Sequence, residues 1–250
     1  MLKENEHFEP LGGGIKIIVS DIHHFSTDTI LLADFSHPKL GCKAVDLGSG
    51  CGTISLLWLR DNKNITVDAV EIQPDAADMI KRSSALNSLF DRLNAVNCDL
   101  KELKGVLPFG CYDLVACNPP YKLSGSGIVN PEFGKTLARH EKSCTLEDIF
   151  AAAKNLLQFG GRFCMCQRPE RLTDILSLMR KNDLEPKRIR FVQQRISKPP
   201  KLVLVEGRRG GKTGSLVTMP TLFIEDENGD FSQEMKEIYG CYKSEHLKEC

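Results

Sequence analysis

The residues in this chain that are best suited to chemistry form a short run near its middle, which consists of Asn118, Pro119, Pro120 and Tyr121. The apolar residues 112–117 before it predict a buried strand, so the run stands where a strand opens into a loop. In an open α/β sheet, ligands bind at the carboxyl ends of the strands. An amide oxygen, carbonyls held by two prolines and one aromatic face suit a flat, conjugated –NH₂ group. The alternative is a proline turn that only ends a strand.

A second group of candidate residues surrounds a glycine-rich turn after the predicted strand 43–47. The turn contains Gly48, Gly50 and Gly52, and glycine there permits a tight turn and close approach of a ligand to the backbone. On its own this pattern also fits a nicotinamide or flavin dinucleotide. Asp46 precedes the glycines, where it would repel a pyrophosphate and attract a cationic amino group. We therefore favour S-adenosylmethionine over NAD.

Two further acids stand at the ends of the next predicted strands. Glu71 lies at the end of strand 65–72, where a carboxylate can accept both hydroxyls of a ribose. Asp99 follows strand 93–98, at the level where an adenine amino group would lie. Each acid alone could be only a polar residue at a strand end. Three acids in register at successive strand ends are harder to explain by chance.

The predicted elements that position these residues alternate between strand and helix. Strands are expected at 43–47, 65–72, 93–98, 112–117 and 162–167. The late strands 188–193 and 202–206 are too close in sequence for a crossover helix and should pair antiparallel. Thr145 and Asp148 form a capping-box-like start of a helix that continues to Gly160. The sequence predicts a doubly wound α/β fold whose mostly parallel, seven-stranded sheet has a late antiparallel hairpin.

Composition limits the classes to which the protein can belong. Its 250 residues are 41% apolar and 26% charged, which is typical of a soluble globular protein. No stretch predicts a membrane span or a signal peptide, and the ten cysteines contain no CxxC pair. We expect a cytoplasmic protein with reduced thiols and no metal. We also expect an N-terminal preamble over 1–40, a core domain over 41–225 and an acidic tail over 226–250.

The formal net charge is zero, but cations concentrate in one late segment. They are Lys187, Arg188, Arg190, Arg195, Lys198, Lys201, Arg208, Arg209 and Lys212, and the only acid among them is Glu206. A local basic surface can bind phosphates even in a neutral protein. A solvated sheet edge is the alternative.

Residues 44–206 resemble the Rossmann-like class I methyltransferases that carry an Asn-Pro-Pro-Tyr motif. Within that class, residues 25–35, 138–141, 198–201 and 206–207 resemble the bacterial adenine-N6 methyltransferases that modify valine tRNA next to the anticodon. The resemblance implies an enzyme that transfers a methyl group from S-adenosylmethionine to the N6 amine of an adenine in tRNA. It also implies that the segment from Lys187 to Lys212 contacts tRNA phosphates.

The same resemblance implies a role for each cofactor-binding candidate. Asp46, Gly48, Gly50 and Gly52 would hold the methionine end of the cofactor, Glu71 its ribose and Asp99 its adenine. Asp28 would help to close the methionine side, and helix capping explains this residue equally well.

The resemblance also assigns the target side. Asn118 and the Pro119 carbonyl would accept hydrogens from the target amine, with Pro120 as part of the rigid motif, and Tyr121 would stack on the base. The loop 122–144 contains Arg139, His140 and Glu141, of which His140 could be catalytic or simply exposed. A phosphate contact suits Arg139 if that loop folds over the site.

Other substrates with a planar –NH₂ group are left open. Glutamine-N5 methyltransferases that act on proteins carry a sizeable helical domain before the glycine turn, and DNA adenine methyltransferases carry a large target-recognition domain. Guanine-N2 methyltransferases of ribosomal RNA have a similar motif, typically with Phe where Tyr121 stands. An inactive cofactor-binding or RNA-binding module is the last alternative, and the intact motif argues against it. The oligomeric state is also left open.

Overall fold

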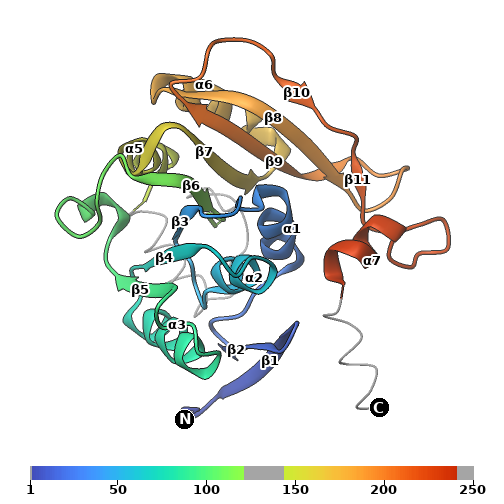
Figure 1. Ribbon diagram of the computed structural model, residues 1–250. Helices are drawn as coiled ribbons and strands as arrows, with labels where there is room; N and C mark the ends of the chain where they lie inside the picture. Colours follow the sequence, from blue (N-terminus) through green and yellow to red (C-terminus); the bar gives the residue numbers. More distant parts are fainter. Residues whose placement is uncertain (1, 121–143, 241–250) are drawn as a thin grey trace, which may run out of the picture.

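A nine-stranded sheet lies between two layers of helices in the computed structural model, which describes residues 2–120 and 144–240 (Figure 1). The strands are β3 (Lys43–Leu47), β4 (Thr66–Glu71), β5 (Leu93–Asn97), β6 (Tyr112–Cys117), β7 (Leu157–Gln167), β8 (Leu184–Gln193), β9 (Pro200–Arg209), β10 (Val217–Thr218) and β11 (Leu222–Phe223). Their order across the sheet is β10-β8-β9-β7-β6-β3-β4-β5, and β11 also pairs with β8.

The pairing directions confirm the predicted sheet. Strands β3 to β7 are all parallel, whereas β9 pairs antiparallel with both β7 and β8. These seven strands are the predicted ones. The two-residue strands β10 and β11 were not predicted, and both run parallel to β8 along its outer edge.

Helices cover the two faces of the sheet and bury one hydrophobic cluster on each. The helices on one face are α1 (Thr27–Ser36), α2 (Thr53–Asp61) and α3 (Pro74–Leu86), and those on the other are α5 (Leu146–Leu156) and α6 (Leu172–Lys181). Strand residues alternate between the clusters: Ala44 packs with α1–α3, while Val45 packs with α5 and α6. This alternation and the buried parallel strands explain the doubly wound arrangement.

The boundary between α5 and β7 differs from the expectation. The predicted capping box is present, with Thr145 Oγ1 accepting from the Asp148 amide and the Asp148 carboxylate accepting from the Thr145 amide. The helix ends at Leu156 rather than at Gly160, because Leu157 already has extended backbone and pairs with Tyr112. An apolar residue such as Leu157 fits the buried face of a helix and a buried strand equally well, so the hydrophobic pattern alone could not locate the end of the helix.

The two ends of the described chain pack beside the first helices. A hairpin of β1 (Glu6–Gly12) and β2 (Ile15–Ser20) lies along α3, where the Ile18 amide donates to Ser83 Oγ at 3.0 Å. Helix α7 (Gln233–Tyr239) falls within the expected acidic tail, yet it buries Met235, and the Tyr239 hydroxyl lies 2.9 Å from Thr27 Oγ1. None of the described helices is both long and apolar enough to cross a bilayer.

Candidate active site

The carboxyl ends of four neighbouring strands bring the predicted site residues to one edge of the sheet. Asp46 of β3 pairs with Ala69 of β4 and with Ala116 of β6, so the glycine turn lies between the ends of those strands. Glu71 ends β4, and Asn118 follows β6 directly. We call this side of the sheet the carboxyl edge and the opposite side the amino edge. Tyr121 and residues 139–141 lie outside the described residues.

The glycine turn is held by the next strand. The amides of Gly48 and Ser49 both donate to the Val70 carbonyl, at 2.9 and 3.0 Å. The Gly50 amide donates to Glu71 Oε2 at 2.8 Å, and the Gln73 amide donates to Oε1 at 2.9 Å. Each carboxylate oxygen therefore already accepts one bond and retains a second lone pair for a ligand hydroxyl. Glu71 thus also shapes the turn, which was not predicted.

Glycine is required at the three positions of the turn for two different structural reasons. All have positive φ, at 66° for Gly48, 55° for Gly50 and 90° for Gly52. A Cβ atom on Gly48 or Gly50 would meet no atom of the described residues within 4 Å, so among these residues there is open space where a ligand can approach the backbone. A Cβ atom on Gly52 would lie 3.0 Å from Ile80 Cγ1, so that glycine permits close packing of α2 against α3.

Asp46 is a fully buried carboxylate with one incompletely satisfied oxygen. Its Oδ2 accepts from Ser55 Oγ at 2.8 Å and from the Ser55 amide at 3.3 Å, whereas Oδ1 has no partner among the described residues. Burial raises the pKa of this carboxyl from 3.8 to about 7, despite the bonds from Ser55. A cationic amino group that donates to Oδ1 would satisfy the buried oxygen and stabilise the ionised form.

The side-chain amide of Asn118 is held at both ends. Its Nδ2 donates to Thr29 Oγ1 of α1 at 2.9 Å, and the Cys166 thiol of β7 donates to its Oδ1 at 3.0 Å. Cys166 is completely buried, so solvent does not compete for this contact. The Pro119 ring is also buried, whereas Pro120 is exposed. The Asn118 amide is therefore positioned from both sides, with its oxygen on the side of Cys166.

The two remaining cofactor candidates occupy element ends near the same edge. Asp28 lies in the first turn of α1, next to Thr29, and is half-buried. Asp99 starts a short 3-10 helix (Leu100–Glu102): its Oδ1 accepts from the Lys101 amide at 2.9 Å, and its Oδ2 lies 3.4 Å from Lys101 Nζ. Their predicted roles toward a cofactor stay predictions.

Three residues of the site were missed by the sequence analysis, namely Thr29, Ser55 and Cys166. They lie 89, 9 and 48 positions away from the side chains that they contact. No motif marks such pairs, because the contacts arise only when α1, α2 and β7 pack around the ends of β3 and β6.

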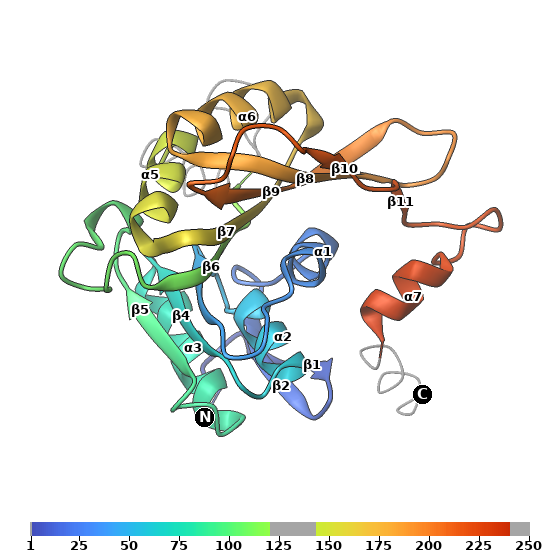
Figure 2. The same cartoon turned by 45° about the horizontal axis from the view of Figure 1, so that its top comes forward.

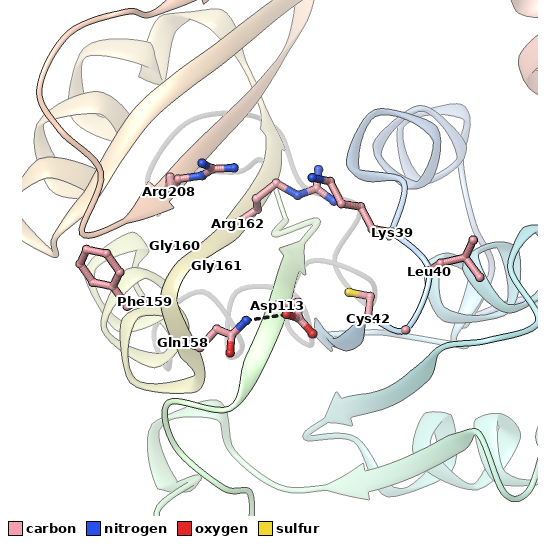
Figure 3. A pocket seen from close by; sticks show the side chains of 11 residues that line it. Lys39, Leu40, Cys42, Asp113, Gln158, Phe159, Gly160, Gly161, Arg162 and Arg208 are labelled. Carbon is pink, nitrogen blue, oxygen red and sulfur yellow. Dashed lines mark hydrogen bonds between the residues drawn. The ribbon is translucent and has the colours of Figure 1, made fainter.

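A cavity of about 260 Å³ lies at the amino edge, around the beginnings of β6 and β7 (Figure 3). Lys39, Arg162 and Arg208 line one side of it. Its acid, Asp113, accepts from Gln158 Nε2 at 2.6 Å and, through its other oxygen, from the Lys43 amide. None of the predicted catalytic or cofactor-binding residues lines this cavity, so it is separate from the candidate active site.

The basic segment between Lys187 and Lys212 is less free than its composition indicates. Five of its cations have partners within the protein: Arg188 pairs with Glu206, Arg190 with Glu234 and Arg195 with Glu225, Lys187 donates to the Gly214 carbonyl, and Arg209 donates to the Leu157 carbonyl. The side chains of Lys198, Lys201, Arg208 and Lys212 have no ionic partner among the described residues.

Comparison with known proteins gives relatives that share one name. The tRNA1(Val) (adenine(37)-N6)-methyltransferase of Aliivibrio salmonicida is 31% identical over 137 residues, which cover 55% of this chain and 56% of the relative. The protein of that name from Porphyromonas gingivalis is 29% identical over 66% of this chain and 64% of its own length. A third, from Pedobacter heparinus, is 33% identical over 55% and 57%. The matches thus span between about half and two thirds of these relatives.

Solved structures show the same fold at low sequence identity. A predicted O-methyltransferase from Agrobacterium tumefaciens has a TM-score of 0.69 and 19% identity, covering 86% of this chain and 97% of its own. A geranyl diphosphate methyltransferase in complex with SAM has a TM-score of 0.54 and 15% identity, covering 72% and 84%. The fold is therefore the mostly parallel Rossmann-like methyltransferase fold with its antiparallel hairpin.

The family comparison covers the residues that build the carboxyl edge. The model of the methyltransferase small domain matches residues 23–181, which include α1, the glycine turn, Asn118 and Cys166. More than half of the chain lies within this match. The chain belongs to the methyltransferase small domain family.

Proposed function

We propose that the protein methylates the N6 amine of an adenine in tRNA, next to the anticodon, with S-adenosylmethionine as methyl donor. The observation that carries this proposal is an amide oxygen, on Asn118, fixed beside a glycine turn and a buried carboxylate, one of whose oxygens has no partner among the described residues. The names of the relatives support the choice of tRNA as substrate.

The cofactor side of the proposal rests on the fit of the described residues. Asp46 Oδ1 would accept from the amino group of the methionine portion, and the open space at Gly48 and Gly50 would receive the methionine portion. The free lone pairs of Glu71 would accept the ribose hydroxyls, with Asp99 near the adenine and Asp28 closing the methionine side. S-adenosylmethionine, when bound, supplies an electrophilic methyl group on a sulfonium.

The target side requires activation of a poor nucleophile, because the lone pair of an adenine N6 amine is delocalised into the ring. Asn118 Oδ1 and the Pro119 carbonyl would accept its two hydrogens, favour a tetrahedral nitrogen and stabilise the positive charge that develops on it. No strong general base is required, since the resulting ammonium is very acidic. Alignment by rigid acceptors would supply much of the rate.

The contacts of Asn118 suit this role. Thr29 Oγ1 accepts from the amide nitrogen and the Cys166 thiol donates to the amide oxygen, so the amide is oriented from both sides for a target amine. The target base must be unstacked to reach this position, and an anticodon loop presents such a base at low cost. Tyr121 would stack on it, an interaction worth about 1–3 kcal/mol.

The proposal is tested by incubating the full chain and labelled S-adenosylmethionine with unmodified tRNA, ribosomal RNA, DNA or a protein extract. We expect label in tRNA that digests to N6-methyladenosine. Label in ribosomal RNA as N2-methylguanosine, or only in protein as methylglutamine, would contradict the substrate assignment. Absence of transfer to all four, with cofactor binding retained, would contradict the enzymatic proposal itself.

A further inference from the structure

The cations of the late basic segment that have no ionic partner among the described residues lie toward opposite ends of the β8–β9 hairpin. Val203 of β9 pairs with Gln167, the last residue of β7, so residues 200–202 and the turn before them continue past the carboxyl end of β7. Arg208 pairs with Arg162, which lies beside Leu114 near the beginning of β6, at the amino edge. Lys201 and Arg208 are seven strand residues apart, or about 23 Å. The register thus divides one basic run into two separate groups.

We call residues 194–201 the hairpin tip. Both views show that it extends beyond the other strands of the sheet (Figure 2). Its Lys198 and Lys201 side chains are exposed and have no ionic partner among the described residues. Ile196, two residues before Lys198, has 82% of its surface exposed. Two exposed cations and an exposed apolar side chain at the tip together form a surface that suits a partner with both negative charge and apolar groups.

The tip is connected to the candidate active site through the end of β7. Arg168 donates from Nη1 to the Lys201 carbonyl at 3.1 Å, and Arg168 stands two residues after Cys166, whose thiol contacts Asn118. A large substrate that extends from Asn118 along this side of the sheet would meet the tip. The tip and the amide lie on the same edge of the sheet.

The tip is also held in one conformation. The Lys198 amide donates to the Arg195 carbonyl at 3.0 Å, Gln193 Nε2 donates to the Lys198 carbonyl, and Arg195 pairs with Glu225 at 2.6 Å. Since Glu225 neutralises Arg195, Lys198 and Lys201 carry the positive charge that is available to a partner. A preorganised surface avoids part of the ordering cost of binding.

We propose that the hairpin tip binds the RNA strand that presents its base to Asn118. Lys198 and Lys201 contact its phosphates, and Ile196 packs against a neighbouring base, as apolar side chains do where bases are unstacked. This inference rests on the proposed function and specifies which part of the basic segment carries it. Arg208 and Lys212, at the other end of the hairpin, do not contact the RNA near the reactive base.

Two double variants of the full chain test the proposal, Lys198→Ala with Lys201→Ala at the tip and Arg208→Ala with Lys212→Ala at the amino edge. Both remove two exposed cations from the same basic segment, so each controls for the other. We expect the tip variant to bind tRNA roughly ten-fold more weakly at moderate salt and to reduce the slope of log K against log salt by about 1.4. The amino-edge variant should keep the wild-type affinity and slope.

A second pair of variants tests the apolar contact of Ile196. Ile196→Ala should lower kcat/KM for tRNA several-fold without changing the salt slope. Leu40→Ala removes a similarly exposed aliphatic side chain at the amino-edge cavity and should leave kcat/KM unchanged.

The outcomes separate this inference from the function on which it rests. Loss of affinity and slope in the amino-edge variant, with the tip variant unchanged, would overturn the tip assignment while leaving tRNA as substrate. Equal, small losses in both variants would overturn it as well. A wild-type chain that neither binds nor methylates tRNA would overturn the proposed function, and the tip assignment with it.

Discussion

The two edges of the parallel sheet are built by the same strands, yet they satisfy their polar groups differently. At the amino edge, both oxygens of Asp113 are hydrogen-bonded, and the adjoining cavity is wide enough to hold a small molecule. At the carboxyl edge, Asp46 is completely buried and its Oδ1 has no partner among the described residues. A buried polar atom without a partner is costly unless a ligand completes it. The Asp46 oxygen without a described partner therefore favours the carboxyl edge as the place where a ligand binds.

The largest expected effect on cofactor binding is that of Asp46→Asn, which tests whether the carboxyl edge binds the cofactor. The substitution removes the charge that would face the cofactor amino group but keeps an acceptor for Ser55. Loss of one partner of a buried charge pair costs about 2–5 kcal/mol, so affinity for S-adenosylmethionine should fall by between about 30-fold and about 5,000-fold. Calorimetric titration measures this, with Asp113→Asn at the amino edge as the matched control. Equal affinities in both variants would contradict the assignment of Asp46.

The pH dependence of cofactor binding gives a second test of the role of Asp46 at the carboxyl edge. Burial raises the pKa of Asp46 to about 7 in the free protein, and a cationic ligand favours the ionised carboxylate. Affinity should therefore rise with pH up to about 7, by at most about ten-fold per unit, and binding should release a proton in that range. Titrations in buffers of different ionisation enthalpy measure the proton release. Asp46→Asn should flatten the profile, and a wild-type profile that is already flat would contradict this account.

The same pKa gives a prediction for stability without ligand. A carboxyl with a raised folded pKa binds more protons in the folded than in the unfolded state between the two pKa values. Its contribution to stability is full below pH 3.8, its ordinary value, and is lost as pH rises to about 7. Denaturant unfolding across this range should show a decline that Asp46→Asn removes.

The smallest expected effect concerns the orientation of Asn118. Thr29→Val removes the acceptor for Nδ2, whereas Thr29→Ser keeps it. Loss of one hydrogen bond of about 1–1.5 kcal/mol predicts a fall in kcat of roughly five-fold to ten-fold, with cofactor affinity unchanged. Single-turnover kinetics and cofactor titration on both variants check this. A serine variant as slow as the valine variant would show that the hydroxyl is not the active feature.

Much of the fold could be predicted from the chain, because its signals are local. The short connection between residues 193 and 200 excludes a crossover helix, which alone predicts the antiparallel pairing of β8 and β9. The end of α5 could not be predicted, because Leu157 suits a helix and a strand alike. The motif around Asn118 and the acids at strand ends also have local patterns.

The rest of the site depends on packing that no local pattern encodes. The contacts of Asn118 with Thr29 and Cys166 join three elements distant in sequence. The unpartnered oxygen of Asp46 follows from burial by several neighbours. The cations between Lys187 and Lys212 form one cluster in the sequence, whereas the hairpin spreads them along its length, with Lys198 and Lys201 toward one end and Arg208 toward the other.

The most direct test of the central claim, that the carboxyl edge carries the reaction, is Asn118→Ala measured for methyl transfer to tRNA and for cofactor affinity in the same preparation. We predict that transfer is lost while affinity for S-adenosylmethionine stays within about two-fold of the wild type, because Asn118 acts on the target amine and not on the cofactor. Asp113→Asn, at the amino edge, should retain both. Full transfer by Asn118→Ala, or its loss in Asp113→Asn alone, would contradict the account.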